Sequence, residues 1–291
     1  MVKESTVPFI PRTEPICPRN ERQPEVREKD TIAIKCPKCK VILYRRDWEK
    51  NLKVCSRCMY HFKLTAYERI DLLVDPDTFV EVDADITSID PLSFVSDSQT
   101  YAAKLNDERR KTGLNEAVVI GHALVEDRPL ALVIMDFRFI GGSMGSAVGE
   151  KITRAIELGI AQHIPVLIVS ASGGARMQEG LYSLMQMAKT ASALAMLGEE
   201  KLLYISLLTD PTAGGVTASF AVLGNVILAE PGALVCFAGP RVIEQFMHVS
   251  LPEGSVTSEF MLEHGMIDAV VPRRELRRTL GRLLQLYSYM E

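Results

Sequence analysis

From residue 117 onward the chain alternates short, largely apolar runs with longer amphipathic stretches. The apolar runs predict buried strands at 117–125, 129–137, 166–170, 202–208, 233–239 and 268–272. The stretches between and after them predict helices at 145–163, 177–197, 216–229, 240–247, 257–264 and 274–290. Buried strands separated by helices are typical of α/β proteins with mainly parallel strand pairing. The pattern therefore predicts a large α/β domain.

Before residue 117 the pattern is different. Residues 1–30 are rich in proline and charge and have no apolar core, so we expect a disordered leader. Residues 31–64 carry paired cysteines joined by short strands such as 41–46, and helices are predicted within 61–75 and at 101–110. We therefore divide the chain into a leader at 1–30, a small cysteine-rich module at 31–64 and the α/β domain at 65–291.

Four of the six cysteines form two pairs with the spacing C-x₂-C-x₁₅-C-x₂-C. They are Cys36, Cys39, Cys55 and Cys58. Thiolates on two tight turns can meet at one tetrahedral ion, and this spacing is typical of a zinc ribbon. Cysteines so close in the chain rarely form a disulfide with each other. The sequence therefore predicts one structural Zn²⁺ ion in residues 31–64.

Charge is distributed unevenly along the chain. Residues 1–65 contain 15 lysines and arginines against 8 acidic residues, a balance of +7, whereas the rest contains 18 against 29, a balance of −11. A basic N-terminal part followed by an acidic remainder indicates two modules with different binding partners, or else a solvated N-terminal tail that binds no partner. No apolar run is long enough to span a membrane, and the first 30 residues lack a signal core. We expect a cytoplasmic protein with no membrane partner.

Glycine-rich turns follow four of the predicted strands, at 139–149, 172–176, 210–216 and 237–241. In α/β sheets, ligands bind at the carboxyl ends of strands, where turns lead into helix N-termini with unpaired N–H groups. Glycine allows a ligand to approach the backbone closely. Such donors can serve a phosphate or a developing oxyanion. We therefore expect one site at which these turns meet.

No side-chain catalyst is evident. The sequence has no GxxxxGK[ST] loop, no GxGxxG at a first strand-to-helix turn and no GxSxG elbow. The five histidines are scattered. Asp136 and Asp210 each end an apolar run and could act as acids, bases or orienters, although Asp210 precedes a proline and is more typical of a turn. The residues alone thus predict an α/β enzyme core with backbone donors.

Several long stretches carry a family resemblance: 137–151, 170–190, 208–225, 237–245, 258–271 and the cysteine-rich module. Together they closely resemble the carboxyltransferase β subunit of bacterial and plastid acetyl-CoA carboxylase, over about residues 30–285. The resemblance implies a crotonase-like fold, a right-handed spiral of ββα units, behind the zinc ribbon. It also implies transfer of a carboxyl group from carboxybiotin to acetyl-CoA, which gives malonyl-CoA in the first step of fatty acid biosynthesis.

The resemblance also assigns roles to the glycine turns. In the family's chemistry the biotin itself removes the α-proton of acetyl-CoA, so the protein supplies aligned N–H donors and excludes water. We assign these donors to Gly173, Gly174 and Ala175 in one turn and to Gly214 and Gly215 in the other. The second pair is favoured as an oxyanion-stabilising pair. Which turn serves the thioester and which the biotin is left open.

Three further residues are assigned to the CoA side of the site. Gly141 and Gly142 are expected to shape the CoA channel. Arg176 has two alternative roles, contact with a CoA phosphate or bracing of its loop through an ion pair with Glu179.

The resemblance further implies partners. The chain has no biotin-acceptor motif and no ATP-binding glycine loop, and its length suits one crotonase-like half. It would therefore need a carboxyltransferase α subunit in an α₂β₂ assembly, a biotin carboxyl carrier protein and a biotin carboxylase.

Two other functions are left open. One is a different crotonase-type enzyme, such as a hydratase or an isomerase. The other is nucleic-acid binding through the basic ribbon, whose cations include Lys35, Lys38 and Lys40, with nucleic acid kept as a secondary partner. The same ribbon could instead roof the CoA entrance or dock a partner subunit.

Overall fold

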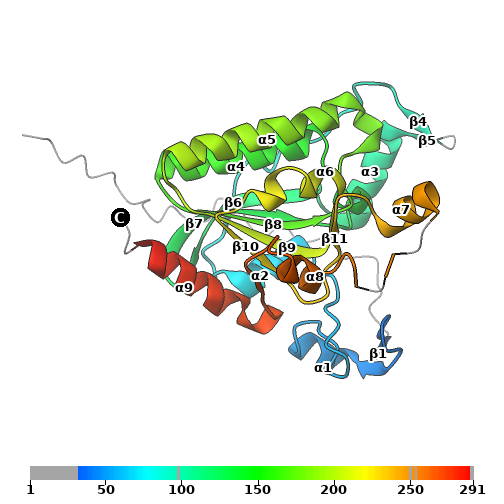
Figure 1. Cartoon of the computed structure of the whole chain (residues 1–291). Helices are drawn as coiled ribbons and strands as arrows, with labels where there is room; N and C mark the ends of the chain where they lie inside the picture. The colour runs from blue at the N-terminus through cyan, green and yellow to red at the C-terminus, as the bar shows by residue number, and fades with distance from the viewer. Residues whose placement is uncertain (1–31, 97–98, 249–250, 253, 289–291) are drawn as a thin grey trace, which may run out of the picture.

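The computed structural model of the chain describes residues 32–96, 99–248, 251–252 and 254–288, so the predicted leader lies outside the described residues. Its centre is an eight-stranded sheet. Seven strands follow the order β12-β10-β9-β8-β7-β6-β3, and the eighth, β11, pairs with the C-terminal end of β9, on residues that β10 does not reach. Helices cover both faces of this sheet, and a small separate module lies below it in Figure 1.

Most of the sheet is parallel. The strands β7 (Arg128–Met135), β8 (Val166–Ser172), β9 (Tyr204–Ala213), β10 (Val226–Ala229) and β12 (Ala269–Val270) pair in parallel, as does the short β11 (Val235–Cys236) with β9. The strands β6 (Val118–Val125) and β3 (Val80–Glu81) are antiparallel to their neighbours. Parallel strands need cover on both faces, which explains why their residues are almost all apolar.

Helices form a layer on each side. On one face α4 (Ser146–Gln162) packs against β6 and β7, and α5 (Leu181–Glu199) packs on α4. On the other face α2 (Ala66–Leu73) and α9 (Leu276–Ser288) contact β6 and β7. Three shorter helices lie at the periphery: α3 (Tyr101–Thr112), α7 (Pro240–Met247) and α8 (Ser258–Glu263) (Figure 1). No helix among the described residues is both long and apolar enough to cross a bilayer.

The predicted helix at 216–229 is wrong. The segment holds a four-residue helix α6 (Gly214–Thr217), a 3₁₀ turn (Phe220–Val222) and then the strand β10. The side chain of Asn225 accepts a hydrogen bond from the Tyr204 N–H (2.8 Å), which ends the helical path beside the start of β9. The β-branched residues that follow then enter the sheet between β9 and β12.

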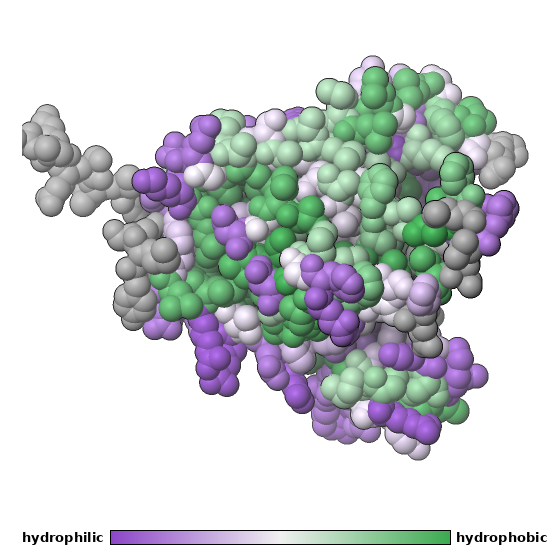
Figure 2. All heavy atoms as spheres, in the orientation of Figure 1, coloured by the Kyte–Doolittle hydropathy of each residue, from purple (hydrophilic) through white to green (hydrophobic). Residues whose placement is uncertain are grey.

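The cysteine-rich module pairs β1 (Ala33–Lys35) with β2 (Ile42–Tyr44), which is followed by α1 (Arg45–Lys50). The strand predicted at 41–46 is therefore shorter, because α1 begins at Arg45. Trp48 packs edge-to-face on Phe62, with ring centroids 5.1 Å apart, and forms the small core of the module. In Figure 2 hydrophilic side chains gather on this module and on α9, and hydrophobic ones gather near the N-terminal end of α5.

Candidate active site and zinc ribbon

The turns that follow β8 and β9 lie directly against each other. A Cβ atom built on Gly174 would lie 3.1 Å from the Cα of Gly214, and one built on Gly215 would lie 3.3 Å from the Cβ of Ala175. Gly174 and Gly214 also have positive φ angles, +118° and +62°, that L side chains rarely adopt. Glycine is therefore required where the two turns touch, and the structure brings both predicted donor segments to one place.

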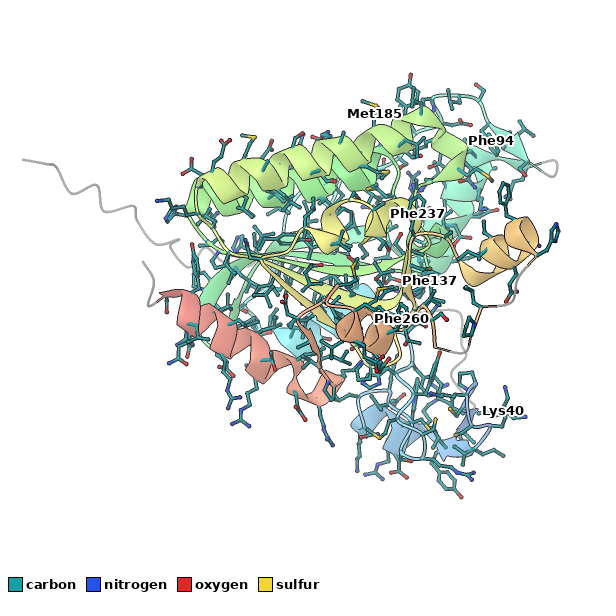
Figure 3. The ribbon with its side chains drawn as sticks, viewed as in Figure 1. Lys40, Phe94, Phe137, Met185, Phe237 and Phe260 are labelled. Atoms are coloured by element: carbon teal, nitrogen blue, oxygen red, sulfur yellow. The ribbon has the colours of Figure 1, made fainter. Side chains whose placement is uncertain are left out.

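Three of the five predicted N–H donors already bond inside the protein. The N–H of Gly173 donates to the Gly141 carbonyl (2.9 Å), that of Gly174 to the Ser172 hydroxyl (3.0 Å) and that of Gly214 to the Phe237 carbonyl (3.0 Å). Phe237 lies at the same end of the sheet as these turns (Figure 3). These internal bonds fix the shape of the turns, and the three amides have no free hydrogen left for a ligand.

The N–H groups of Ala175 and Gly215 have no acceptor among the described residues. Gly215 is the second residue of α6, where a helical N–H has no partner within the helix. The two amides are close, because a Cβ atom on Gly215 would lie 3.6 Å from the Ala175 nitrogen. Ala175 is half-buried, and exposed Gly173 and half-buried Gly214 lie beside the pair. The site thus offers two neighbouring backbone donors, the half-buried Ala175 and the buried Gly215.

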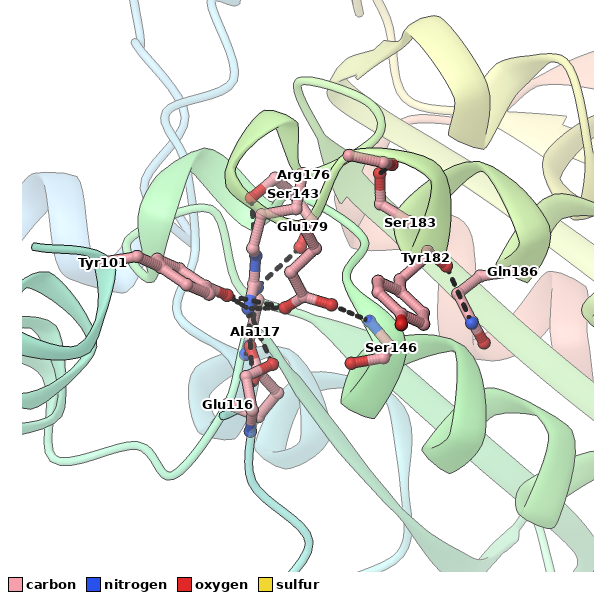
Figure 4. A network of polar contacts seen from close by, with 12 residues as sticks. Tyr101, Glu116, Ala117, Ser143, Ser146, Arg176, Glu179, Tyr182, Ser183 and Gln186 are labelled. Atoms are coloured by element: carbon pink, nitrogen blue, oxygen red, sulfur yellow. Dashed lines mark hydrogen bonds and ion pairs between the residues drawn. The ribbon is translucent and has the colours of Figure 1, made fainter. Parts of the chain in front are cut away.

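Arg176 is fully buried and braces the first turn (Figure 4). Its guanidinium donates to the Glu116 carboxylate (2.6 and 3.2 Å) and to the carbonyl (2.7 Å) and hydroxyl (3.1 Å) of Ser143. It also donates to the hydroxyls of Ser88 and Tyr101, both at 3.0 Å. A side chain so enclosed has no donor left for a CoA phosphate, so the structure supports the bracing role.

The expected ion pair of Arg176 with Glu179 is present at 3.7 Å, and a second, shorter one joins Arg176 to Glu116 at 2.6 Å. Glu179 also accepts the Tyr101 hydroxyl (2.6 Å) and the N–H of Ser146 (2.6 Å) at the start of α4. Burial alone would raise the pKa of Glu116, but the charge and hydrogen bonds of Arg176 hold that pKa below its ordinary value. The network joins α3, α4 and the first turn into one rigid unit.

Gly141 and Gly142 form a third turn beside the first. Gly142 has φ +64°, and a Cβ atom there would lie 2.0 Å from the Ala171 carbonyl oxygen, so only glycine fits at this position. A Cβ atom built on Gly141, which has φ +63°, would have only the Phe137 ring within 4 Å. The Gly141 carbonyl accepts the hydrogen bond from the N–H of Gly173. This open side of Gly141 suits the predicted channel, which stays a prediction.

The four predicted zinc ligands converge in the cysteine-rich module. Their Sγ atoms all lie within 4.8 Å of one another, with Cys36 and Cys58 at 3.6 Å and Cys39 and Cys55 at 3.7 Å. Four sulfurs at the usual zinc–sulfur distance of about 2.3 Å from one tetrahedral ion would be about 3.8 Å apart. The residues present therefore fit a structural zinc ion.

Comparisons with known proteins agree with this geometry. A family model described as "Carboxyl transferase domain" matches residues 61–273, and one described as "Acetyl-CoA carboxylase zinc finger domain" matches residues 34–58. A relative from Synechococcus sp. (strain RCC307), named acetyl-coenzyme A carboxylase carboxyl transferase subunit beta, is 53% identical over 91% of both chains. One of the same name from Pelotomaculum thermopropionicum is 52% identical over 91% of this chain and 93% of its own.

This chain belongs to the acetyl-CoA carboxylase carboxyltransferase β family. Its resemblance to that family is thereby confirmed, as is the fold class. Among solved structures, transcarboxylase 12S is similar with a TM-score of 0.65 and 26% identity over 83% of this chain, which spans 44% of that longer chain. A Pseudomonas malonate decarboxylase MdcD–MdcE hetero-dimer shares the fold with a TM-score of 0.58 over 78% of this chain and 86% of its own.

In this carboxyltransferase β chain Asp136 and Asp210 both accept hydrogen bonds from backbone N–H groups. Asp136 is fully buried and accepts hydrogen bonds from the N–H groups of Ala66 (2.8 Å) and Arg138 (3.0 Å) and from the Arg138 guanidinium. It thereby fixes the start of α2 beside the end of β7. Asp210 lies within β9 rather than at its end, and accepts the Leu234 N–H (3.2 Å).

Sequence reasoning missed the buried acids that hold the β chain together. Besides Glu116, the fully buried Glu230 accepts hydrogen bonds from both Arg69 and Arg273. Burial would raise the pKa of Glu230, but the two arginines hold it far below its ordinary value. The only signal for such residues in the sequence is a charged residue inside or beside an apolar run.

Substitution of the cysteines tests the zinc site directly. We expect one zinc ion per wild-type chain and none in the double variant Cys36→Ser/Cys55→Ser, because a hydroxyl is a poor zinc ligand and two ligands are lost. Metal content by elemental analysis measures this. As a control, Cys236→Ser, in the sheet, should keep one zinc ion, and loss of zinc there would contradict the assignment.

Proposed function

We propose that this chain is the β half of an acetyl-CoA carboxylase carboxyltransferase. It transfers a carboxyl group from carboxybiotin on a carrier protein to acetyl-CoA and gives malonyl-CoA, the first step of fatty acid biosynthesis. The observation that carries the proposal is the pair of unbonded amides of Ala175 and Gly215, at the carboxyl ends of adjacent parallel strands in a chain of this family.

The two amides suit a reaction that develops charge on a carbonyl oxygen. Loss of the α-proton of a thioester moves negative charge onto its oxygen, and fixed N–H donors stabilise that oxygen more in the transition state than in the ground state. The donors of Ala175 and Gly215 are backbone groups held by the packed turns, so they need no reorganisation when the charge develops.

The acids near the turns are poor candidates for a general base. Glu116, Glu179, Glu230 and Asp136 are all buried and accept hydrogen bonds from the protein itself. Carboxybiotin, as the second substrate, supplies the carboxyl group and a basic site for the α-proton. The chain's own contribution is then to orient the thioester, exclude water and stabilise the oxyanion.

We propose that an α subunit completes the site and that the assembly is α₂β₂. The outer face of α5, next to the first turn, exposes a row of large apolar side chains that includes Leu181, Tyr182, Leu184 and Met185 (Figure 2). Exposed apolar patches of this kind mark protein interfaces. The similarity to one part of the longer transcarboxylase 12S chain supports a partner that supplies the rest. A biotin carboxyl carrier protein and a biotin carboxylase would provide the carboxybiotin.

The test is reconstitution with an α subunit. We expect the purified β chain to show no transferase activity alone, and the mixture to carry out malonyl-CoA-dependent carboxylation of biocytin, the reverse reaction. Product formation is followed by coupled detection of acetyl-CoA. Full activity of the β chain alone would contradict the half-site proposal. Turnover of an enoyl-CoA by the β chain would favour a hydratase or isomerase instead.

We propose that the enzyme works in the cytoplasm, where thiols stay reduced and available to zinc. Nucleic acid is a secondary partner that the exposed cations Lys35, Lys38 and Lys40 could bind. Salt-dependent retention of the β chain on RNA or DNA would test this, and salt-independent behaviour would dismiss it.

A further inference from the structure

Lys63 lies at the junction between the ribbon and the α/β domain, where the backbone is held on both sides. On one side the Phe62 carbonyl accepts a hydrogen bond from the buried Arg273 guanidinium (2.8 Å). On the other side Thr65 begins α2 with a capping box, in which its side chain accepts the N–H of Glu68 (3.2 Å). The Ala66 N–H, next in the chain, donates to Asp136 (2.8 Å). These anchors fix the position from which the Lys63 side chain extends.

The Lys63 side chain reaches over the end of β7. Its ammonium lies 3.4 Å from the centroid of the Phe137 ring, within the range of a cation–π contact. It makes no hydrogen bond or ion pair to any described residue, and Lys63 is exposed to solvent. Although much of the side chain is exposed, partial desolvation of the ammonium against the protein lowers the pKa of Lys63, and the charge of Asp210 acts in the opposite direction. The Asp210 carboxylate does not pair with the ammonium and instead holds the Leu234 N–H.

Lys63 also belongs to the end of the sheet that carries the donor turns. It lines a cavity of about 10 Å³, room for about one water molecule, whose other lining residues include Ala171 on β8 and Asp210 on β9. Ala171 precedes Gly173 by two residues, and Asp210 precedes Gly214 by four. The cavity therefore lies between residues 61–64 and the strands β8 and β9, just before the turns of these strands.

A chain of contacts links Lys63 to the first turn. The Phe137 ring under its ammonium also flanks Gly141, at 4.0 Å from the position of a Cβ atom there. The Gly141 carbonyl in turn accepts the N–H of Gly173. Figure 3 labels Phe137 at the end of the sheet that faces the ribbon. An unpaired cation thus stands beside the predicted CoA channel.

We propose that Lys63 binds an anionic oxygen of the acyl-CoA substrate, on a CoA phosphate or on the malonyl carboxylate, and that one role of the ribbon is to hold it there. The inference rests on the proposed function of the same site. An ammonium that is held over an aromatic ring and makes no salt bridge has its N–H donors available to an anionic ligand. The phosphate and carboxylate sources share this chemistry, and the choice of substrates separates them.

The test compares Lys63→Met, Lys63→Arg and wild-type β chains in complex with the α subunit. Methionine keeps an apolar stem over Phe137 and removes the charge. We expect Lys63→Met to raise the KM for malonyl-CoA about tenfold, the size of one lost charge-assisted hydrogen bond, with kcat and zinc content unchanged. Lys63→Arg should recover most of the affinity. The control Lys50→Met removes an exposed lysine at the end of α1 and should leave the KM unchanged.

Substrate fragments identify the anion. If Lys63 binds a CoA phosphate, Lys63→Met and wild type should act equally on malonyl-pantetheine, which has no nucleotide. If it binds the carboxylate, the defect should persist with malonyl-pantetheine and be absent with acetyl-CoA in the forward reaction. An unchanged KM in all these assays overturns the proposal for Lys63, while a wild-type complex without any transferase activity overturns the proposed function itself. Titration of the complex with CoA alone gives a binding readout that needs no turnover.

Discussion

Replacing Ala175 with proline should lower kcat/KM of the reconstituted carboxyltransferase by about 100- to 1,000-fold, or about 3–4 kcal/mol, which is typical for loss of one oxyanion donor. Proline removes the N–H of Ala175 and places its ring where that hydrogen pointed. No hydrogen bond of the fold is lost, because this N–H has no acceptor among the described residues. The preceding residue, Gly174, has no Cβ atom to clash with the proline ring.

Ala175→Gly is the matched control. It keeps the N–H and removes only a half-buried methyl group, so its kcat/KM should stay near that of wild type. Initial rates of malonyl-CoA-dependent biocytin carboxylation measure both variants, and zinc content and α-subunit binding check that each is folded. A proline variant that is folded and as active as the glycine variant would show that the Ala175 amide is not a donor.

A second pair of variants tests the same site without proline. Gly215→Ala keeps both N–H groups, but its new Cβ atom would lie 3.1 Å from the Met187 sulfur and 3.3 Å from the Ala175 methyl group. We expect it to displace the two turns and lower the rate. Removing the Ala175 methyl group in the double variant Ala175→Gly/Gly215→Ala should restore part of that rate, because one of the two close contacts disappears.

The meeting of the two glycine turns could be predicted from the sequence because its signals are local. Apolar runs that end in glycine pairs mark strand-to-helix turns, and adjacent parallel strands bring such turns together. The choice among the donors could not be predicted in this way. Whether the N–H of Gly173 or that of Ala175 is free depends on the Gly141 carbonyl, which lies about thirty residues earlier in the chain.

The contrast between local signals and contacts of distant residues also explains where the predicted elements differ from the structure. The apolar residues of β10 and the small-residue stretch before them favour a helix, although Gly224 and Asn225 between them are typical helix-stop residues, and the pairing with β9 and β12 decides the state of β10. Arg176 is sixty residues from Glu116 and three from Glu179, so local spacing indicates its ion pair with Glu179 but not the shorter one with Glu116. Contacts between distant segments carry information that periodicity does not contain.

Arg176→Met should destabilise the β chain by about 3–5 kcal/mol, which is typical when one partner of a buried ion pair is removed. Both Arg176 and Glu116 are 0% exposed, so the variant leaves the Glu116 carboxylate buried without its cation. The Ser143 carbonyl and the Tyr101 hydroxyl lose hydrogen bonds as well. Urea unfolding followed by circular dichroism measures the change. Arg154→Met, which breaks ion pairs on the surface with Glu150 and Asp83, is the control and should leave the midpoint nearly unchanged.

The pH dependence of stability separates an electrostatic effect from simple loss of packing. In wild type the pKa of Glu116 is lowered, so its contribution is complete above the ordinary carboxyl pKa and is lost as the pH falls through the folded value. In Arg176→Met the buried carboxyl has no cation, and its folded pKa should rise above the unfolded one. The free energy of unfolding of the variant, relative to wild type, should then improve as the pH falls from 7 toward about 5. A deficit that stays constant over this range would mean that Arg176 acts through packing alone.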